Sequence, residues 1–157
     1  MTTAPVPAVL VSAMQVALVE ARAAAEAGEV PVGAVIVDNT TGAILAMAQN
    51  RMRRDGDGTS HAELLALRMA AKQRGDRDLT DCSLVVTLEP CAMCAGAIVL
   101  SRIDSLVFGA WDDKAGMCGS VGDIVRHPRL NHRPQVRGGV LAEECAALLR
   151  DFFALRR

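Results

Sequence analysis

The sequence predicts an α/β fold in which strands alternate with helices and some neighbouring strands run parallel. Short apolar runs, the first of them rich in β-branched residues, occur at 32–37, 43–48, 83–88 and 105–108. Helical patterns precede, separate and follow these runs. Because strands that alternate with helices form sheets with parallel pairs, we expect such pairs here, joined by right-handed crossovers.

The first part of the chain predicts a helix followed by a β-hairpin. Pro7 can open an alanine-rich helix over 8–27, and Gly28 ends it. The first two apolar runs flank the sequence Asn-Thr-Thr-Gly at 39–42, whose turn-forming residues predict the hairpin.

The next predicted helix follows a loop. The polar, glycine-containing segment 51–60 predicts this loop, and Thr59 or Ser60 can cap a helix that begins near His61 and ends by Gly75.

The second half of the chain predicts two more helices and one long irregular segment. Residues 91–100 predict a helix entered through Pro90, and 141–155 predict an amphipathic helix. The segment 112–137 is rich in Gly, Asp, Pro and Arg, and irregular segments of this length in compact domains are usually functional. Because no repeat or linker interrupts the pattern, we expect a single domain over 1–157.

Composition excludes several classes of protein. With 51% hydrophobic and 22% charged residues the chain is not disordered, and 13 Gly with 6 Pro exclude a collagen-like sequence. No run of about 18 uncharged apolar residues predicts a membrane span. The apolar stretch 8–19 lacks the basic segment that precedes the core of a signal peptide. We therefore expect a cytoplasmic protein without a membrane partner.

The net charge of -1 conceals an uneven distribution. Residues 1–125 carry 10 Lys and Arg against 15 Asp and Glu, whereas 126–157 carry 7 Arg against 3 acidic residues. All four aromatic residues also lie in the last third of the chain. The basic segment is either an ordinary solvated surface or a surface for nucleic acid, and charge alone leaves both open.

Two short motifs at predicted helix starts indicate metal chemistry. They are His-Ala-Glu from His61 to Glu63 and Cys-Ala-Met-Cys from Cys91 to Cys94. Two cysteines three apart at a helix start, with one imidazole, can hold one zinc ion per subunit and leave a fourth position open for water, as in catalytic zinc sites. Glu63 then fits a general base that takes a proton from the water and returns it to the leaving group.

Other interpretations of these residues remain open. Cys-x-x-Cys can be a redox pair, and His or Glu in a first helical turn can be an ordinary surface residue. A zinc-stabilised binding module without catalysis requires a fourth protein ligand. The candidates for that ligand are Cys82, Cys118, Cys145, His127 and His132. If they do not bind metal, Cys82, Cys118 and Cys145 are expected to be ordinary small residues of the core or surface.

His-x-Glu combined with Pro-Cys-x-x-Cys is the signature of the zinc nucleobase deaminases. The sequence resembles the bacterial tRNA-specific adenosine deaminases of this superfamily over nearly its whole length. The segments that carry the resemblance are 28–35, 61–68, 87–98, 101–103, 107–120, 127–133, 138–149 and 151–157. The segments after residue 107 narrow the resemblance from the superfamily to the tRNA-specific adenosine deaminases.

The resemblance implies a fold and a reaction. The fold is the three-layer α/β/α cytidine-deaminase-like fold, with a central mixed five-stranded sheet and helices on both faces. The reaction is hydrolytic deamination of adenosine to inosine at the wobble position, nucleotide 34, of arginine tRNA with an ACG anticodon. Hydroxide on zinc held by His61, Cys91 and Cys94 attacks C6 of the flipped adenine, with Glu63 as proton shuttle. A homodimer that binds the tRNA anticodon stem-loop is implied as well.

By matching position, the resemblance also implies substrate-binding residues. Asn50 is expected to hydrogen-bond the flipped base, although an asparagine there also fits a turn. Phe152 is expected to face the core, which leaves Phe153 to stack on a base. Trp111 stands where the family commonly has a basic or small residue, and either base stacking or a dimer contact fits it. The remaining expected RNA contacts are Asp112, Asp113, Lys114, Arg156 and Arg157.

A second enzymatic function uses the same three zinc ligands. A deaminase of a free base or nucleoside, such as guanine, needs neither the arginines of 126–137 nor the basic end at 151–157. These two segments therefore distinguish the two activities.

Overall fold

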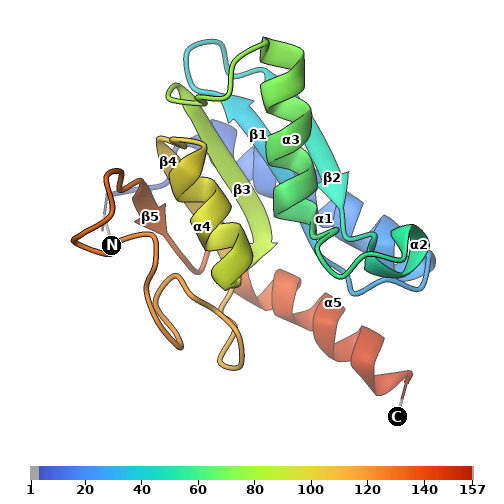
Figure 1. The fold of residues 1–157 in the computed structure, drawn as a ribbon. Coiled ribbons are helices and arrows are strands. Elements are labelled where there is room, and N and C mark those ends of the chain that lie inside the picture. Colours follow the sequence, from blue (N-terminus) through green and yellow to red (C-terminus); the bar gives the residue numbers. More distant parts are fainter. Residues whose placement is uncertain (1–3, 157) are drawn as a thin grey trace.

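A five-stranded mixed sheet forms the centre of the computed structural model, which describes residues 4–156 (Figure 1). The strands are β1 (Gly33–Asp38), β2 (Ile44–Gln49), β3 (Cys82–Leu88), β4 (Ser105–Ala110) and β5 (Gln135–Arg137). Their order is β2-β1-β3-β4-β5. Strand β1 runs antiparallel to both β2 and β3, whereas the pairs β3–β4 and β4–β5 are parallel. The expected mixed sheet and the hairpin are thus confirmed.

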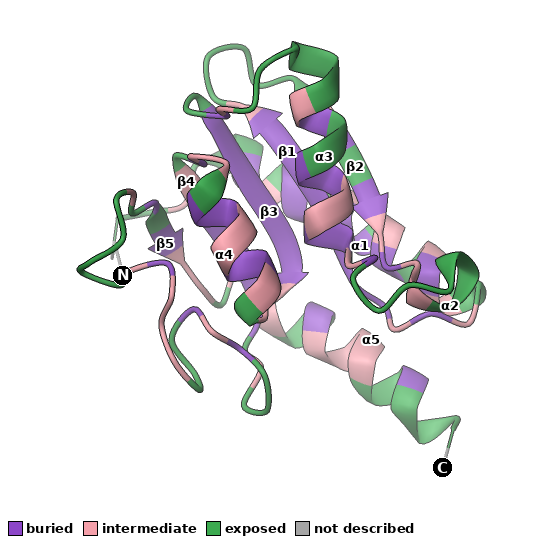
Figure 2. Ribbon diagram, viewed as in Figure 1, coloured by how far each residue is buried: buried purple, intermediate pink, exposed green. Residues whose placement is uncertain are grey.

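Helices cover both faces of the sheet and complete three layers. They are α1 (Ala8–Glu26), α2 (Met52–Asp55), α3 (Ala62–Arg74), α4 (Ala92–Leu100) and α5 (Ala142–Ala154). Helices α3 and α4 lie on one face, and α1 with the start of α5 lies on the other (Figure 1). The central strands β1, β3 and β4 are almost entirely buried, the edge strands β2 and β5 are partly exposed, and the far end of α5 is mostly exposed (Figure 2).

Helix α1 packs directly against β1. A Cβ atom on Gly33 would lie 2.0 Å from the carbonyl oxygen of Ala17, so only glycine allows this approach. With a mean hydropathy of 1.5, α1 is long and apolar enough to span a membrane, by length and composition alone. The structure accounts for this composition differently, because residues such as Met14 and Leu18 of α1 are buried against the sheet.

Three local features differ from the sequence predictions. The expected loop 51–60 contains the one-turn helix α2, and the expected irregular segment 112–137 ends in the short strand β5. Neither Thr59 nor Ser60 caps α3, because the residue at the N-cap is His61. Four residues in a helix and three in a strand give too few side chains for a recognisable period, so these elements depend on tertiary contacts.

Candidate functional site

The candidate site lies where β2 and β3 end and α3 and α4 begin. Glu89 and Pro90 follow β3 and lead into Cys91, which is the N-cap residue of α4, just as His61 is the N-cap residue of α3. Neither residue makes a side-chain capping hydrogen bond. The N-termini of α3 and α4 thus lack side-chain caps and lie together at the candidate site. Because a helix N-terminus carries partial positive charge, this position favours anionic thiolates.

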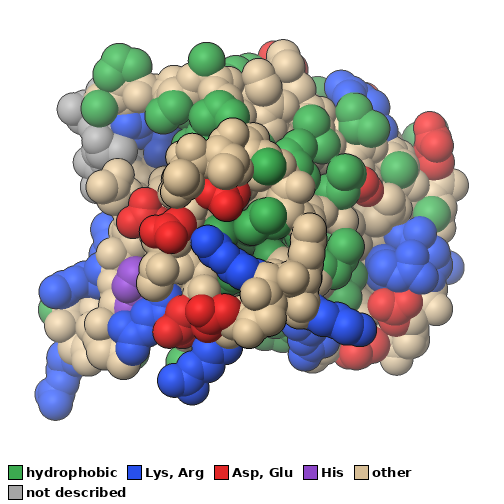
Figure 3. Space-filling view, turned by 90° about the horizontal axis from the view of Figure 1, so that it is seen from above, with side chains coloured by type: hydrophobic (Ala, Val, Ile, Leu, Met, Phe, Trp, Pro, Cys, Tyr) green, Lys and Arg blue, Asp and Glu red, His purple; other side chains and the backbone are tan. Residues whose placement is uncertain are grey.

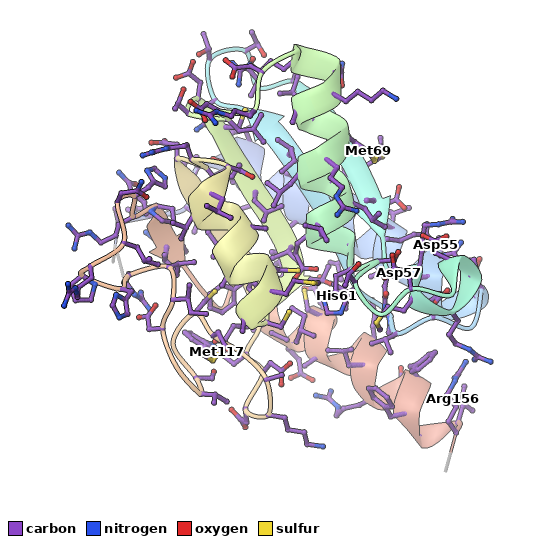
Figure 4. All side chains as sticks on the ribbon, viewed as in Figure 1. Asp55, Asp57, His61, Met69, Met117 and Arg156 are labelled. Atoms are coloured by element: carbon purple, nitrogen blue, oxygen red, sulfur yellow. The ribbon has the colours of Figure 1, made fainter. Side chains whose placement is uncertain are left out.

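His61, Cys91 and Cys94 form a compact group of possible metal ligands. Their ligand atoms all lie within 4.8 Å of one another, and Nδ1 of His61 is 3.5 Å from Sγ of Cys91 and 3.7 Å from Sγ of Cys94. Figure 4 shows His61 at the start of α3, turned toward the sulfur atoms at the start of α4. One imidazole with two thiolates is a donor set that suits zinc.

The group stabilises negative charge on the sulfur of Cys91. The Cys94 thiol donates a hydrogen bond to Cys91 and, despite burial, lowers the pKa of Cys91 to about 3, with His61 helping. The same hydrogen bond and burial raise the pKa of Cys94. The hydrogen bond between His61 and Cys91 raises the pKa of His61, although burial alone would lower it. A cation that replaces the shared proton would meet donors already arranged for it.

Glu63 lies beside this group with its carboxyl group almost fully buried. The residue is 4% exposed, and burial raises the pKa of its carboxyl group to about 7, although its own backbone N–H and the nearby His61 favour the charged form. Near neutral pH such a carboxyl group both accepts and donates a proton.

A cavity of about 140 Å³ brings five of the predicted site residues together. They are Asn50, His61, Glu63, Cys91 and Asp112. The other lining residues are Val30, Val32, Met52, Ala62, Leu88, Glu89 and Ala115. Its wall is thus mostly apolar with a few polar groups that converge, which is typical of a small-molecule pocket.

Asn50 has a structural role as well as a place in the cavity wall. Its Oδ1 accepts a hydrogen bond from the N–H of Met52 at 3.2 Å, and its Nδ2 lies 3.4 Å from the carbonyl oxygen of Val30. The side chain is 3% exposed. Asn50 thus lines the cavity, as the resemblance implied, and also shapes the turn into α2, as the alternative interpretation expected.

The three residues expected to contact RNA after β4 are separated by the structure. Asp112 lines the cavity, and its Oδ1 accepts hydrogen bonds from the N–H groups of Lys114 and Ala115. Asp113 and Lys114 are exposed and do not line the cavity. Any contact of theirs with a substrate would therefore lie outside it.

The C-terminal residues lie apart from the cavity. Phe152 is buried as expected, whereas Phe153 is 47% exposed and lines a separate shallow depression along α5. The guanidinium group of Arg156 lies 3.4 Å from the centre of the Phe152 ring, and Figure 4 shows this arginine near the end of α5, away from His61. Arg157 lies outside the described residues.

Among residues 4–156, no fourth histidine, cysteine or carboxylate joins the metal-ligand group. The candidates have other surroundings. Arg74 donates to Sγ of Cys82, Sγ of Cys118 lies near the carbonyl oxygen of Pro90, and Nε2 of His132 lies 2.6 Å from the carbonyl oxygen of Ile103. Cys145 packs under Gly109, and Nδ1 of His127 accepts from the N–H of Arg129. Within the described chain the group therefore has the three ligands of an open site.

Trp111 packs against the core at its edge. Its ring meets that of Phe108 edge to face, with centroids 4.8 Å apart, and 44% of the residue remains exposed. The exposed part of Trp111 is compatible with both of its expected roles, base stacking and a dimer contact.

Sequence reasoning missed two buried carboxylates that hold the walls of the cavity. Glu29 is 1% exposed and accepts hydrogen bonds from the backbone N–H groups of Arg53 and Arg54 in α2. Glu89 is 2% exposed and accepts hydrogen bonds from the segment after β4. The position of Glu89 beside the Pro-Cys motif was the only available signal, because acidic residues are usually exposed.

Comparison with known proteins assigns a family to this site. A family model described as the cytidine and deoxycytidylate deaminase zinc-binding region matches residues 8–110. The chain is 46% identical over 140 residues to the tRNA-specific adenosine deaminase of Bacillus subtilis, covering 89% of this chain and 86% of that protein. It is 51% identical over 142 residues to the tRNA(Ile)-lysidine synthase of Deinococcus radiodurans, covering 90% of this chain but only 24% of that protein.

Solved structures of both kinds of deaminase are similar to this chain. A structure from a study of A-to-I editing by tRNA:A34 deaminases is 43% identical, with a TM-score of 0.84, covering 88% of this chain and 99% of that chain. The guanine deaminase of Nitrosomonas europaea is 27% identical, with a TM-score of 0.77, covering 98% of both chains. The chain is thus more similar in sequence and structure to the tRNA deaminase.

Proposed function

Because the chain belongs to the zinc-dependent cytidine and deoxycytidylate deaminase family, and within it to the tRNA-specific adenosine deaminases, we propose that it edits the wobble position of tRNA. The reaction is hydrolysis of the adenosine at nucleotide 34 to inosine with release of ammonia. The proposed substrate is arginine tRNA with an ACG anticodon, acted on in the cytoplasm.

One observation carries this proposal. The group His61, Cys91 and Cys94 lies at a cavity that His61, Cys91 and the buried Glu63 line together, in a chain whose similarity to a tRNA-specific adenosine deaminase extends over about nine-tenths of its length. The catalytic motifs alone would fit any member of the superfamily. The higher sequence identity to the A34-deaminase structure, 43% against 27% for the guanine deaminase, supports this substrate over a free base such as guanine.

The proposed zinc ligands are Nδ1 of His61 and Sγ of Cys91 and Cys94. When bound, zinc would supply a Lewis acid that lowers the pKa of water to about 7. Because no fourth protein ligand joins these three within residues 4–156, the site keeps a place for that water.

Glu63 is the proposed proton shuttle. Its carboxylate accepts a proton from the water that adds to C6 of adenine, and the resulting carboxyl group donates a proton to the amino group that leaves as ammonia. Burial keeps bulk water from competing for this proton. Asn50, in the wall of the cavity, is the proposed hydrogen-bond partner for the edge of the base.

The RNA around the target base would contact the exposed residues outside the cavity. Asp113 and Lys114 lie on the segment that begins at the cavity with Asp112, Phe153 is exposed on α5, and Arg156 is exposed just after this helix. An exposed aromatic ring stacks on an unpaired base, and arginines neutralise phosphates. The target adenine is already single-stranded in the anticodon loop, so its extrusion costs little.

A homodimer is the proposed assembly. The outward residues of α4 are apolar or small, and no charged residue occurs between Cys91 and Ser101. Leu100 at the end of this helix is 80% exposed. An exposed helix face without charge is typical of a surface that is covered by another chain.

The proposal is tested by inosine formation on synthetic substrates. We expect the zinc-loaded protein to deaminate an arginine anticodon stem-loop with the ACG sequence, and to leave free adenosine, guanine and cytidine unchanged. A stem-loop with guanosine in place of the wobble adenosine is the matched control. Deamination of guanine without deamination of the stem-loop would assign the alternative activity.

A further inference from the structure

Glu89 is a buried carboxylate at the wall of the cavity. It lies between the end of β3 and the metal-ligand candidate Cys91, and it lines the same cavity as Glu63. Only 2% of the residue is exposed, and no lysine or arginine side chain pairs with it among the described residues. A charge buried without a cation must be compensated by hydrogen bonds.

One segment, residues 112–120, supplies all the hydrogen bonds that compensate this charge. Oε1 accepts from the N–H of Asp112 at 3.0 Å and from the hydroxyl of Ser120. Oε2 accepts from the N–H of Cys118 and from the N–H of Ser120, both at 3.0 Å. Four donors from one segment thus converge on a single side chain, and both carboxylate oxygens are fully used.

The segment wraps closely around the carboxylate. A Cβ atom on Gly116 would lie 2.3 Å from Cδ of Glu89, so glycine is the residue that lets the backbone approach this far. The N–H of Met117 also donates to the carbonyl oxygen of Pro90, 2.9 Å away. The segment is therefore attached to the short connection that ends at Cys91.

The same segment forms part of the cavity and of its surroundings. Asp112 and Ala115 line the cavity, while Asp113 and Lys114 between them are exposed. A fully satisfied buried polar network specifies one geometry, because any displacement leaves a buried charge without its donors. Glu89 thus determines where the segment stands relative to the metal-ligand group.

We propose that Glu89 is a positioning residue that holds the segment 112–120 at the cavity, in the place where the segment meets the RNA substrate. The inference rests on the proposed function and adds to it a residue that acts through the segment and not on the reacting atoms. Substrate binding should depend on it more than the chemical step does.

Glu89→Gln tests the inference without changing the size of the side chain. All four groups around the carboxylate donate hydrogen bonds to it, and each carboxylate oxygen accepts from at least one backbone N–H. The NH₂ group of glutamine, itself a donor, must therefore face at least one backbone N–H. We expect the KM for the anticodon stem-loop to rise about tenfold or more, with kcat changed less than about threefold and one zinc per chain retained. Glu26→Gln, the same change at an exposed carboxylate, is the control.

Two further variants test the same contact from the other side. Gly116→Ala forces the segment away from Glu89 and should raise KM in the same way, whereas Ser120→Ala removes one hydrogen bond of four and should raise KM less. If Glu89→Gln does not fold, these two variants still decide the question.

A second readout does not depend on activity. The Cys118 thiol is fully buried in the segment, so displacement of the segment should speed its modification by a thiol reagent, followed at that residue by mass spectrometry. Unchanged Cys118 labelling and an unchanged KM in Glu89→Gln and Gly116→Ala would overturn the inference. So would a loss of kcat with zinc loss and an unchanged KM. If the wild type makes no inosine, the proposed function fails, and the labelling still tests whether Glu89 holds the segment.

Discussion

At the scale of single residues, the site depends on environments that only the folded chain provides. Glu63 occupies an ordinary position for an acidic residue, the first turn of a helix, yet it is buried beside two thiols and an imidazole. Burial raises its pKa to about 7. The surroundings, more than the residue type, make this carboxyl group suited to proton transfer.

Replacing Glu63 should separate metal binding from catalysis. In Glu63→Gln we expect kcat for the anticodon stem-loop to fall roughly 10²- to 10⁴-fold, because a glutamine cannot shuttle a proton. The zinc content should stay at one per chain, measured by atomic absorption, since the ligand atoms are unchanged. Full inosine formation in Glu63→Gln would show that the proton moves by another route, and Glu26→Gln serves as the neutral comparison.

Glu29 predicts how stability depends on pH. Burial of this carboxylate raises its pKa, but the N–H groups of Arg53 and Arg54 and the Arg54 side chain outweigh burial, so the pKa lies below its ordinary value of 4.5. The unfolded chain therefore binds this proton more readily than the folded chain. The stabilisation is complete above pH 4.5 and is lost as the pH falls through the lower, folded-state pKa.

Glu29→Gln should accordingly destabilise the protein by about 1–3 kcal/mol at pH 7. The difference from wild type should shrink as the pH is lowered below 4.5, because the wild-type carboxylate then becomes protonated and loses the same interactions. Urea denaturation of both proteins at pH 7 and in acid measures this. A difference that stays constant with pH would rule out the assigned role of the charge.

At the scale of elements, the long helices and the strands of six or seven residues were predicted correctly, and only the two shortest elements, α2 and β5, were missed. Helix α1 has 19 residues and α3 and α5 have 13 each, which gives several turns of pattern. By contrast, α2 is held in place by Glu29, which lies 24 residues before Arg53. The strand β5 exists because it pairs with the edge of β4. Local sequence cannot reveal such partners.

Helix α5 provides a test of RNA binding outside the cavity. Phe153→Ala should raise the KM for the anticodon stem-loop about five- to a hundredfold, the range for loss of one stacked base, while zinc content and kcat stay nearly unchanged. Val19→Ala removes an exposed apolar side chain from α1 and should have no effect. An unchanged KM in Phe153→Ala would remove α5 from the proposed RNA surface.

At the scale of the whole molecule, the distribution of charge is more informative than its sum. The net charge of -1 combines an acidic first part with an arginine-rich last part. On the face seen in Figure 3, acidic and basic side chains are interspersed, so this face does not present one sign of charge. An RNA that contacts a small area responds to the local charge, since salt screens charges farther away than about 10 Å.

The outward face of α4 predicts the oligomeric state. Leu100→Asp places a charge on the most exposed part of this apolar face, and we expect the protein to become a monomer by sedimentation velocity. The matched change Val19→Asp on α1 should leave the proposed dimer intact. A Leu100→Asp variant that remains dimeric would place the interface elsewhere.

The sequence by itself determined the fold class, the hairpin, the long helices and the three ligand candidates, because these depend on local periodicity and on motifs of fixed spacing. The tertiary structure decided which chain segments form the cavity around them. Asn50, Cys91 and Asp112 follow three different strands, His61 is the N-cap residue of α3, and the four meet only when the sheet assembles. It also decided that Glu29 and Glu89 are buried, since the donors that compensate a buried charge come from distant segments that folding brings within hydrogen-bond distance.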